Sequence, residues 1–256
     1  MPAYSLIDSH CHLDFSDFDS DRSAVIECAG QSGVTDIVVP GAFVGNWAKI
    51  HDLCVTYPRL HPCYGLHPYW ADRHNENELE KLRQQIDSNP CVAIGECGLD
   101  YRPQQTERKK QQYFFEAQLD IALENKLPVV IHAVRATEAV IAQLRRRPGL
   151  CGMVHSYSGS YEQALQLIDL GFYLSLGGAI SYERAHKLRD TARRLPLTSL
   201  LLETDAPDQA DASHQGQRNE PAYLLNVLNA LCALRAETAE SIAQQTSRNA
   251  RSLFNI

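Results

Sequence analysis

The sequence predicts an α/β fold, a single (β/α)₈ barrel that occupies residues 1–256 as one domain. Short apolar runs recur eight times along the chain, and stretches with helical periodicity lie between them. The length suits one barrel of this kind, and no low-complexity tract, long linker or charge block divides the chain. An open doubly wound sheet is the alternative, although the chain has neither a GxGxxG sequence after the first run nor a P-loop pattern.

The apolar runs are rich in Val, Ile and Leu and have the length of buried parallel strands. In chain order they cover 5–12, 36–41, 61–68, 91–98, 127–133, 152–158, 172–178 and 199–207. Three of the helical stretches end at ordinary stop signals, which are Gly33, Pro128 and Gly171. The tail, 221–254, has the periodicity of two helices.

Composition and charge exclude several classes of protein. No run approaches the roughly 18 apolar residues of a membrane span, and the N-terminus lacks the pattern of a signal peptide, so we expect a cytoplasmic protein. Eight scattered cysteines without a CxxC pair indicate reduced thiols. A net charge of -7 argues against a broad basic surface for duplex DNA, but not against a local phosphate or metal site. No membrane or protein partner is indicated, and a monomer is the default expectation.

Polar residues stand at the ends of six of the predicted strands, where a barrel places its active site. They are His10, His12, His67, Glu96, His132, His155, Glu203 and Asp205. A single histidine at a strand end is more often structural than a ligand. Because six strands share the feature, we expect these side chains to converge at one mouth of the barrel.

The first run, "LIDSHCHLD", contains the densest part of this pattern. Side chains of a strand alternate between its faces, so Asp8, His10 and His12 are predicted to point one way and Cys11 the other. The two histidines would then bind one metal ion from one strand, with Asp8 deeper. By the same rule Glu203 would lie deeper than Asp205, as a supporting group or a proton carrier.

Imidazole and carboxylate groups are good ligands for divalent ions such as Zn²⁺ and Mn²⁺. The predicted ligand set is His10, His12, Glu96, His132, His155 and Asp205. Six ligands are too many for one four-coordinate ion with an open position, and they suit two ions about 3.5–4 Å apart with one carboxylate between them. The expected cofactors are therefore two divalent ions, Zn, Mg or Mn, which support hydrolysis by a metal-activated water. No GxSxG pattern suggests a serine nucleophile instead.

Seven sequence pieces resemble the TatD family of metal-dependent hydrolases, within the amidohydrolase-like barrels. They are "DSHCHLD", "GLHP", "AIGECGLDY", "PVVIHA", "VHSYSGS", "LLETDAP" and "RNEPA", in family order over nearly the whole chain. The resemblance implies a (β/α)₈ barrel and a deoxyribonuclease that removes nucleotides from the ends of DNA or short oligonucleotides.

The resemblance also implies a role for each matching residue. His10, His12 and Asp205 would hold one ion, His132 and His155 the other, and Glu96 would bridge them. Glu96, Glu203 and Asp205 are the expected catalytic residues. The candidates for substrate binding are His67, Arg135 and Arg218, where His67 would lie near a substrate phosphate or a further ion. Trp70 is left open between packing and stacking on a base.

Some positions depart from the common family pattern. Gln215 and Gln217 stand where basic residues are frequent, which reduces the positive charge available for a nucleic-acid backbone. This difference motivates a second hypothesis, an ester or amide hydrolase such as a deacylase of aminoacyl-tRNA. A third hypothesis is a metal-binding barrel without catalytic activity.

Overall fold

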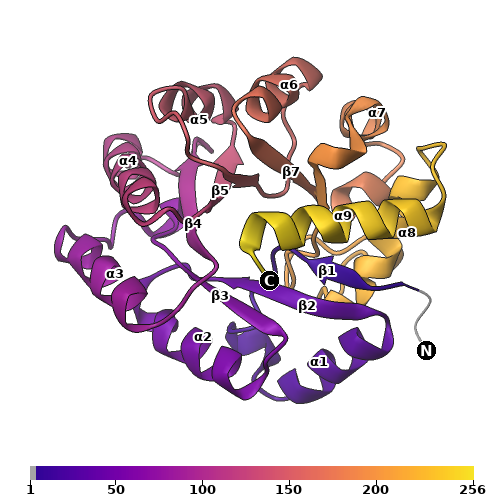
Figure 1. Ribbon diagram of the computed structural model, residues 1–256, viewed down its shortest axis with the longest axis horizontal. Helices are drawn as coiled ribbons and strands as arrows, with labels where there is room; N and C mark the ends of the chain where they lie inside the picture. The colour runs from indigo at the N-terminus through magenta and orange to yellow at the C-terminus, as the bar shows by residue number, and fades with distance from the viewer. Residues whose placement is uncertain (1–3) are drawn as a thin grey trace.

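A computed structural model describes residues 4–256 and confirms the eight-stranded α/β barrel. The strands follow one another around the sheet in chain order, each parallel to the next (Figure 1). They are β1 (Leu6–Asp8), β2 (Val34–Pro40), β3 (Leu60–Tyr64), β4 (Ala93–Asp100), β5 (Val129–Val134), β6 (Gly152–Val154), β7 (Phe172–Leu176) and β8 (Leu200–Leu202). Residues 1–3 of the predicted domain lie outside the described residues.

Backbone hydrogen bonds between the segments that follow β1 and β8 close the barrel. The amide of Ser9 donates to the carbonyl of Leu202 at 3.0 Å, and the amide of Asp205 donates to the carbonyl of His10 at 2.9 Å. Each of the eight predicted runs overlaps a strand, but β1 is much shorter than predicted because the chain leaves the ladder after Asp8.

The helices surround the sheet, as the alternating pattern predicts (Figure 1). They are α1 (Arg22–Gln31), α2 (Val44–Thr56), α3 (Asn77–Ser88), α4 (Arg108–Asn125), α5 (Thr137–Leu144), α6 (Tyr161–Asp169), α7 (His186–Arg194), α8 (Leu224–Cys232) and α9 (Ala239–Phe254). The predicted pair of C-terminal helices corresponds to α8 and α9. Among the described residues, no helix combines the length and the apolar character that crossing a membrane requires.

The interior of the barrel is apolar at one end only. Inward side chains from seven strands form this layer: Ile7, Val38, Cys63, Ala93, Val130, Met153 and Leu201. Helix α9 crosses the same end of the barrel, where Leu253 and Phe254 pack against the layer (Figure 1). This packing closes the end at which the strands begin, and it leaves the polar end, where the strands finish, as the accessible one.

Candidate metal centre

Side chains two positions apart on a strand face the same way, so the residues that follow the apolar layer also face the barrel interior, and they are polar. Val130 faces the barrel interior, and His132, two residues later on β5, also faces inward. Met153 and His155 are related in the same way, as are Leu201 and Glu203. The predicted convergence at one mouth is therefore found, and every one of the eight polar residues is buried.

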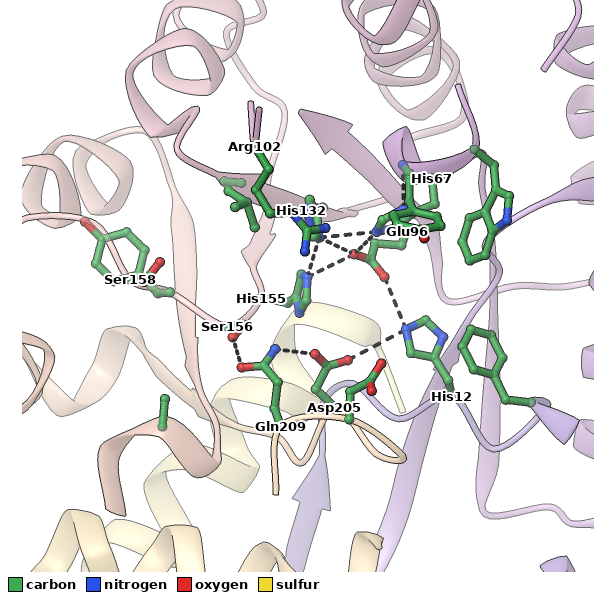
Figure 2. A pocket seen from close by; sticks show the side chains of 18 of the residues that line it. His12, His67, Glu96, Arg102, His132, His155, Ser156, Ser158, Asp205 and Gln209 are labelled. Carbon is green, nitrogen blue, oxygen red and sulfur yellow. Dashed lines mark hydrogen bonds and ion pairs between the residues drawn. The ribbon is translucent and has the colours of Figure 1, made fainter. Parts of the chain in front are cut away.

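Glu96 lies at the middle of this group, and its two oxygens face different sets of histidines (Figure 2). Oε2 lies 3.1 Å from Nε2 of His10 and 3.4 Å from Nε2 of His12. Oε1 lies within 2.8–2.9 Å of nitrogens of the other three histidines, which are His67, His132 and His155. One carboxylate thus separates two clusters of potential metal donors.

The first donor set consists of His10, His12, Asp205 and Oε2 of Glu96. The two imidazole Nε2 atoms are 3.2 Å apart, and Oδ1 of Asp205 lies 3.4 and 3.7 Å from them. At a metal–nitrogen distance of about 2.0–2.1 Å, the donors of a tetrahedral site lie about 3.3–3.4 Å from one another. The spacing of this set therefore matches what one small divalent ion requires.

The second donor set consists of His67, His132, His155 and Oε1 of Glu96. Nδ1 of His132 lies 3.2 Å from Nε2 of His67 and 3.1 Å from Nε2 of His155. His67, which we predicted to bind substrate, thus stands among the donors as a possible fourth ligand. The metal-like groupings His10–His12–Glu96 and His67–Glu96–His132 are both fully buried.

Cations fit these two sets better than hydrogen bonds among the residues alone. Oε2 of Glu96 and Oε2 of Glu203 are buried without a hydrogen-bond partner in the described part of the chain. Nitrogens of three imidazoles lie against Oε1 of Glu96, which has only two lone pairs with which to accept hydrogen bonds. Buried polar atoms are costly unless satisfied, so the donor chemistry and the unpaired oxygens both favour bound divalent ions.

The electrostatics of the cluster point the same way. Burial raises the pKa of Glu96, but His67, His155 and His10 outweigh this effect and hold the pKa of that carboxyl well below its ordinary value. Burial lowers the pKa of His12, yet Glu96 and Asp205 raise it to about 9. The pKa of His67 is lowered to about 4, mainly by burial. Neighbouring carboxylates also raise the pKa of His155 well above its ordinary value, so their negative potential reaches both donor sets, where a cation would replace protons.

Close backbone approach between β4 and β5 brings Glu96 and His132 together. Gly98 has a φ of 146°, and a Cβ atom at this position would lie 2.1 Å from the carbonyl oxygen of His132. Only glycine tolerates both conditions. The pairing of β4 with β5 is irregular between Ile94 and Cys97, which allows Glu96 to face inward at this point.

A hydrogen-bonded link fixes the carboxylates that follow β8. Nε2 of Gln209 donates to Oδ2 of Asp205, and the hydroxyl of Ser156 donates to Oε1 of Gln209 at 2.7 Å (Figure 2). The amide of Ser156 donates to Oε1 of Glu203 at 2.5 Å. Asp205, Gln209 and Ser156 all have φ between 45° and 56°, an unfavourable backbone conformation that often marks a functional site.

The predicted alternation along the first strand is wrong for Asp8. Strand β1 ends at Asp8, so His10 and His12 converge through an irregular segment. The carboxylate of Asp8 accepts hydrogen bonds from the amide and hydroxyl of Thr204, at 3.0 and 2.5 Å, and from the amide of His10. Asp8 therefore ties the end of β1 to the end of β8. Cys11 is buried in the core, away from the donors, as predicted.

The donor sets open into a cavity of about 760 Å³. One wall is aromatic and is formed by Phe15, Tyr69 and Trp70. Phe15 stacks on His12 with ring centroids 4.5 Å apart, and the ring of Trp70 meets that of His67 edge to face, with centroids 5.5 Å apart. Among the described residues that line this cavity, Arg102 is the one Lys or Arg.

The two predicted substrate-binding arginines do not line this cavity. Arg135 has a φ of 54°, and it lines a neighbouring cavity with residues of the α5, α6 and α7 segments. Arg218 binds the carboxylates of Asp21 and Glu220, which holds the loop after β8 against the start of α1. A role of these two arginines in substrate binding stays a prediction, and the structure places neither of them in the lining of the metal cavity.

Sequence reasoning missed Arg102 and Gln209. Arg102 follows the fourth apolar run, in "GLDYRP", and a charged residue just beyond a strand end could have signalled it. Gln209 follows the eighth run in the same way, but nothing in the sequence indicates that its amide reaches Asp205.

Comparisons with known proteins agree with the fold and with a metal-dependent hydrolase. A family model described as TatD related DNase matches residues 7–255. The uncharacterized metal-dependent hydrolase YjjV of Escherichia coli (strain K12) is 40% identical over 253 residues, covering 98% of each chain. The uncharacterized metal-dependent hydrolase YabD of Bacillus subtilis (strain 168) is 34% identical over 253 residues, covering 98% of this chain and 99% of YabD.

Solved structures give the same result. The crystal structure of YjjV, a TatD homologue from Escherichia coli, superimposes with a TM-score of 0.94 over 98% of each chain, at 40% identity. A TatD family hydrolase from Entamoeba histolytica shares the fold, with a TM-score of 0.87 over 99% of each chain at 19% identity. The chain therefore belongs to the TatD family of metal-dependent hydrolases.

Proposed function

We propose that this metal-dependent hydrolase cleaves phosphodiester bonds and acts as a deoxyribonuclease on the ends of DNA or on short oligonucleotides. The observation that carries the proposal is the position of Glu96, whose two oxygens face two separate donor sets at the floor of an open cavity. Paired metal sites that share a carboxylate suit the in-line displacement at phosphorus. The family model that matches the chain describes DNases, which supports the same substrate class.

Two divalent ions, Zn, Mg or Mn, would be held by His10, His12 and Asp205 on one side of Glu96 and by His132 and His155 on the other. Bound there, they would lower the pKa of water and polarise a phosphoryl oxygen. His67 lies close enough to Oε1 of Glu96, at 2.8 Å, to complete the second set.

The protein's own groups would handle the proton. Glu203 is fully buried, and its Oε1 accepts a hydrogen bond while its Oε2 has no partner among the described residues. A carboxylate with a free oxygen beside the reacting group can take a proton and return it to the leaving group. We assign this role to Glu203 or to Asp205, whose Oδ2 is oriented by Gln209.

The walls of the cavity favour a short, flexible substrate. Phe15, Tyr69 and Trp70 offer aromatic faces on which an unpaired base can stack. A single arginine in the lining provides few contacts to phosphates, so a long duplex would gain little affinity. The aromatic wall also favours stacking as the role of Trp70.

The decisive experiment measures cleavage of a short oligonucleotide by metal-free protein reconstituted with Mn²⁺. Chelation should abolish activity, and Mn²⁺ should restore it. Glu96→Gln and His132→Ala should each lower kcat/KM by more than about 100-fold, because even groups that only support metal ligands contribute about 10–100-fold. Glu27→Gln, on the exposed side of α1, is the control and should retain activity. Full activity of the Glu96 variant in a clean preparation would refute the proposal.

A second candidate function keeps the site and changes the substrate. The low positive charge of the cavity would equally suit an ester or amide hydrolase, such as a deacylase of aminoacyl-tRNA. Oligonucleotides and acyl esters assayed side by side distinguish the two. A non-catalytic barrel is less well supported, because the donor sets open into a large cavity.

A further inference from the structure

We propose that Arg102 forms an anion-binding subsite beside the metal centre, which holds a second negatively charged group of the substrate, separate from the bond that is cleaved. The inference rests on the proposed function and specifies its substrate: a phosphodiester with a further phosphate close by.

Arg102 is held in one orientation by Asp100, the last residue of β4. Nε of Arg102 donates to both carboxylate oxygens of Asp100, at 3.0 and 2.9 Å, and Nη2 donates to Oδ2. The backbone amide of Arg102 also donates to Asp100, at 3.0 Å. Guanidinium carries five N–H donors, so this pairing leaves Nη1 without a hydrogen-bond partner among residues 4–256.

The free part of the guanidinium is accessible from the cavity. Asp100 is fully buried, whereas the Arg102 side chain is 37% exposed and lines the cavity together with Tyr69 and His132. Figure 2 shows Arg102 on the cavity wall beside His132. A planar guanidinium fixed on one edge presents its other edge to oxygens of a phosphate or carboxylate.

The same carboxylate contacts the metal centre. Oδ2 of Asp100 lies 3.4 Å from Nε2 of His132, whose Nδ1 lies 2.9 Å from Oε1 of Glu96. Arg102 therefore stands next to the second donor set without being part of it. An anionic group bound by Arg102 would therefore lie beside the group that the second donor set faces, as a neighbouring phosphate of one nucleotide chain can.

A purely structural role for Arg102 makes a different prediction. If the arginine only neutralises Asp100, its loss disturbs His132 and lowers activity on every substrate equally. If it binds a second anion, its loss affects only substrates that carry one, and mainly through KM. The choice of substrate therefore separates the two roles.

The test uses the metal-loaded full-length protein and four substrates: bis(p-nitrophenyl) phosphate, the dinucleotide TpT, TpT with a 5′-terminal phosphate and TpT with a 3′-terminal phosphate. For Arg102→Gln we expect kcat/KM on one phosphorylated dinucleotide to fall at least about 10-fold, mostly through KM, with less than about 2-fold change on bis(p-nitrophenyl) phosphate and on TpT. Arg102→Lys should restore part of the loss. Arg146→Gln, an exposed arginine at the end of α5, controls for the change in net charge.

Two results would overturn the subsite: an equal fall on all four substrates, or no fall on either phosphorylated dinucleotide. The bound metal of each variant is measured by mass spectrometry. An equal fall overturns the subsite with or without loss of metal, because in either case Arg102 acts through Asp100 and His132 and not on a second anion. An unchanged metal content together with substrate-selective loss supports the proposal.

Failure of the proposed function can be distinguished from failure of the anion subsite. If the wild type cleaves none of the phosphodiesters, the nuclease assignment falls, and binding of the phosphorylated dinucleotide is then measured by calorimetry. At least about 10-fold weaker binding by Arg102→Gln keeps the anion subsite, while equal binding overturns it. Mono-p-nitrophenyl succinate, compared with p-nitrophenyl acetate, distinguishes a carboxylate from a phosphate as the second anion.

Discussion

Single residues decide how this site can hold metal ions, and Gln209 is the clearest example among those that are not donors. Its amide group joins Asp205 to Ser156, and Ser156 in turn donates its amide hydrogen to Glu203. The two carboxylates after β8 are thus oriented through one side chain. Groups that orient metal ligands typically contribute about 10–100-fold to metal affinity or activity.

We expect Gln209→Ala to weaken metal binding about 10-fold, with little change in thermal stability. The loss follows because Asp205 would no longer be held toward His10 and His12. Calorimetric titration of metal-free protein with Mn²⁺ measures the affinity. Gln215→Ala, an exposed glutamine of the same loop, is the matched control. Equal affinities for both variants would contradict the role of Gln209.

Metal affinity should increase with pH in the neutral range. Burial alone lowers the pKa of His12 and His155, but neighbouring carboxylates raise it, to about 9 for His12 and well above the ordinary value for His155. Raised pKa values mean that these imidazoles carry protons near pH 7 in the metal-free protein, and an ion must displace them. Titrations between pH 6 and 8, in two buffers that differ in ionisation enthalpy, should show release of at least about one proton per protein. Binding that is independent of pH and buffer would contradict this.

At the scale of elements, helix α9 stabilises the end of the barrel opposite to the metal centre. Its last turn covers the end of the barrel at which the strands begin, where Phe254 is 2% exposed against Ile7, Val130 and the rest of the apolar layer. The strands run from this packed end to the opposite end, where the donors lie. Stability and chemistry are thus concentrated at opposite ends of the same strands.

Phe254→Ala should lower the free energy of unfolding by about 3–5 kcal/mol, because a large buried aromatic side chain leaves a cavity. Metal binding per folded molecule should stay unchanged, since the two ends of the barrel are separate. Urea denaturation measures the first effect and calorimetry the second. Val55→Ala, at a position that is 70% exposed on α2, should have little effect on either. A loss below about 1 kcal/mol for Phe254→Ala would argue against α9 as the closure of the barrel.

At the scale of the whole molecule, charge limits the kind of substrate that can bind. The chain carries a net charge of -7, and Arg102 is the one Lys or Arg among the described residues that line the metal cavity. Affinity for nucleic acid would therefore come from metal ions and stacking more than from release of counterions.

We accordingly expect a weak dependence of kcat/KM on salt. For a single-stranded oligonucleotide, the slope of log kcat/KM against log salt concentration should be about -0.7, the value for one neutralised phosphate. Rates between 50 and 300 mM KCl at constant Mn²⁺ provide the measurement, with bis(p-nitrophenyl) phosphate as a reference of near-zero slope. A slope steeper than about -3 would indicate an extended basic surface instead.

Much of the site follows from local sequence rules. Val130 and His132, or Met153 and His155, are two residues apart, so one strand alone determines that an apolar side chain and a donor face the same way. The barrel then brings the strand ends together. Position at the strand ends of a barrel predicts that Glu96, Asp205 and the histidines converge, although irregular backbone brings Glu96, His10 and His12 to their places.

The tertiary structure alone determined which groups surround those donors. Arg135 and Arg218 lie in loops like Arg102, yet a left-handed backbone turns Arg135 to a neighbouring cavity and carboxylates near α1 hold Arg218. The direction of Asp8 depends on Thr204, which is 196 residues away. Strand alternation is a local property of the backbone that the sequence by itself reveals. Loop direction depends on contacts between distant segments, and therefore only the folded chain decides which cation faces the cavity.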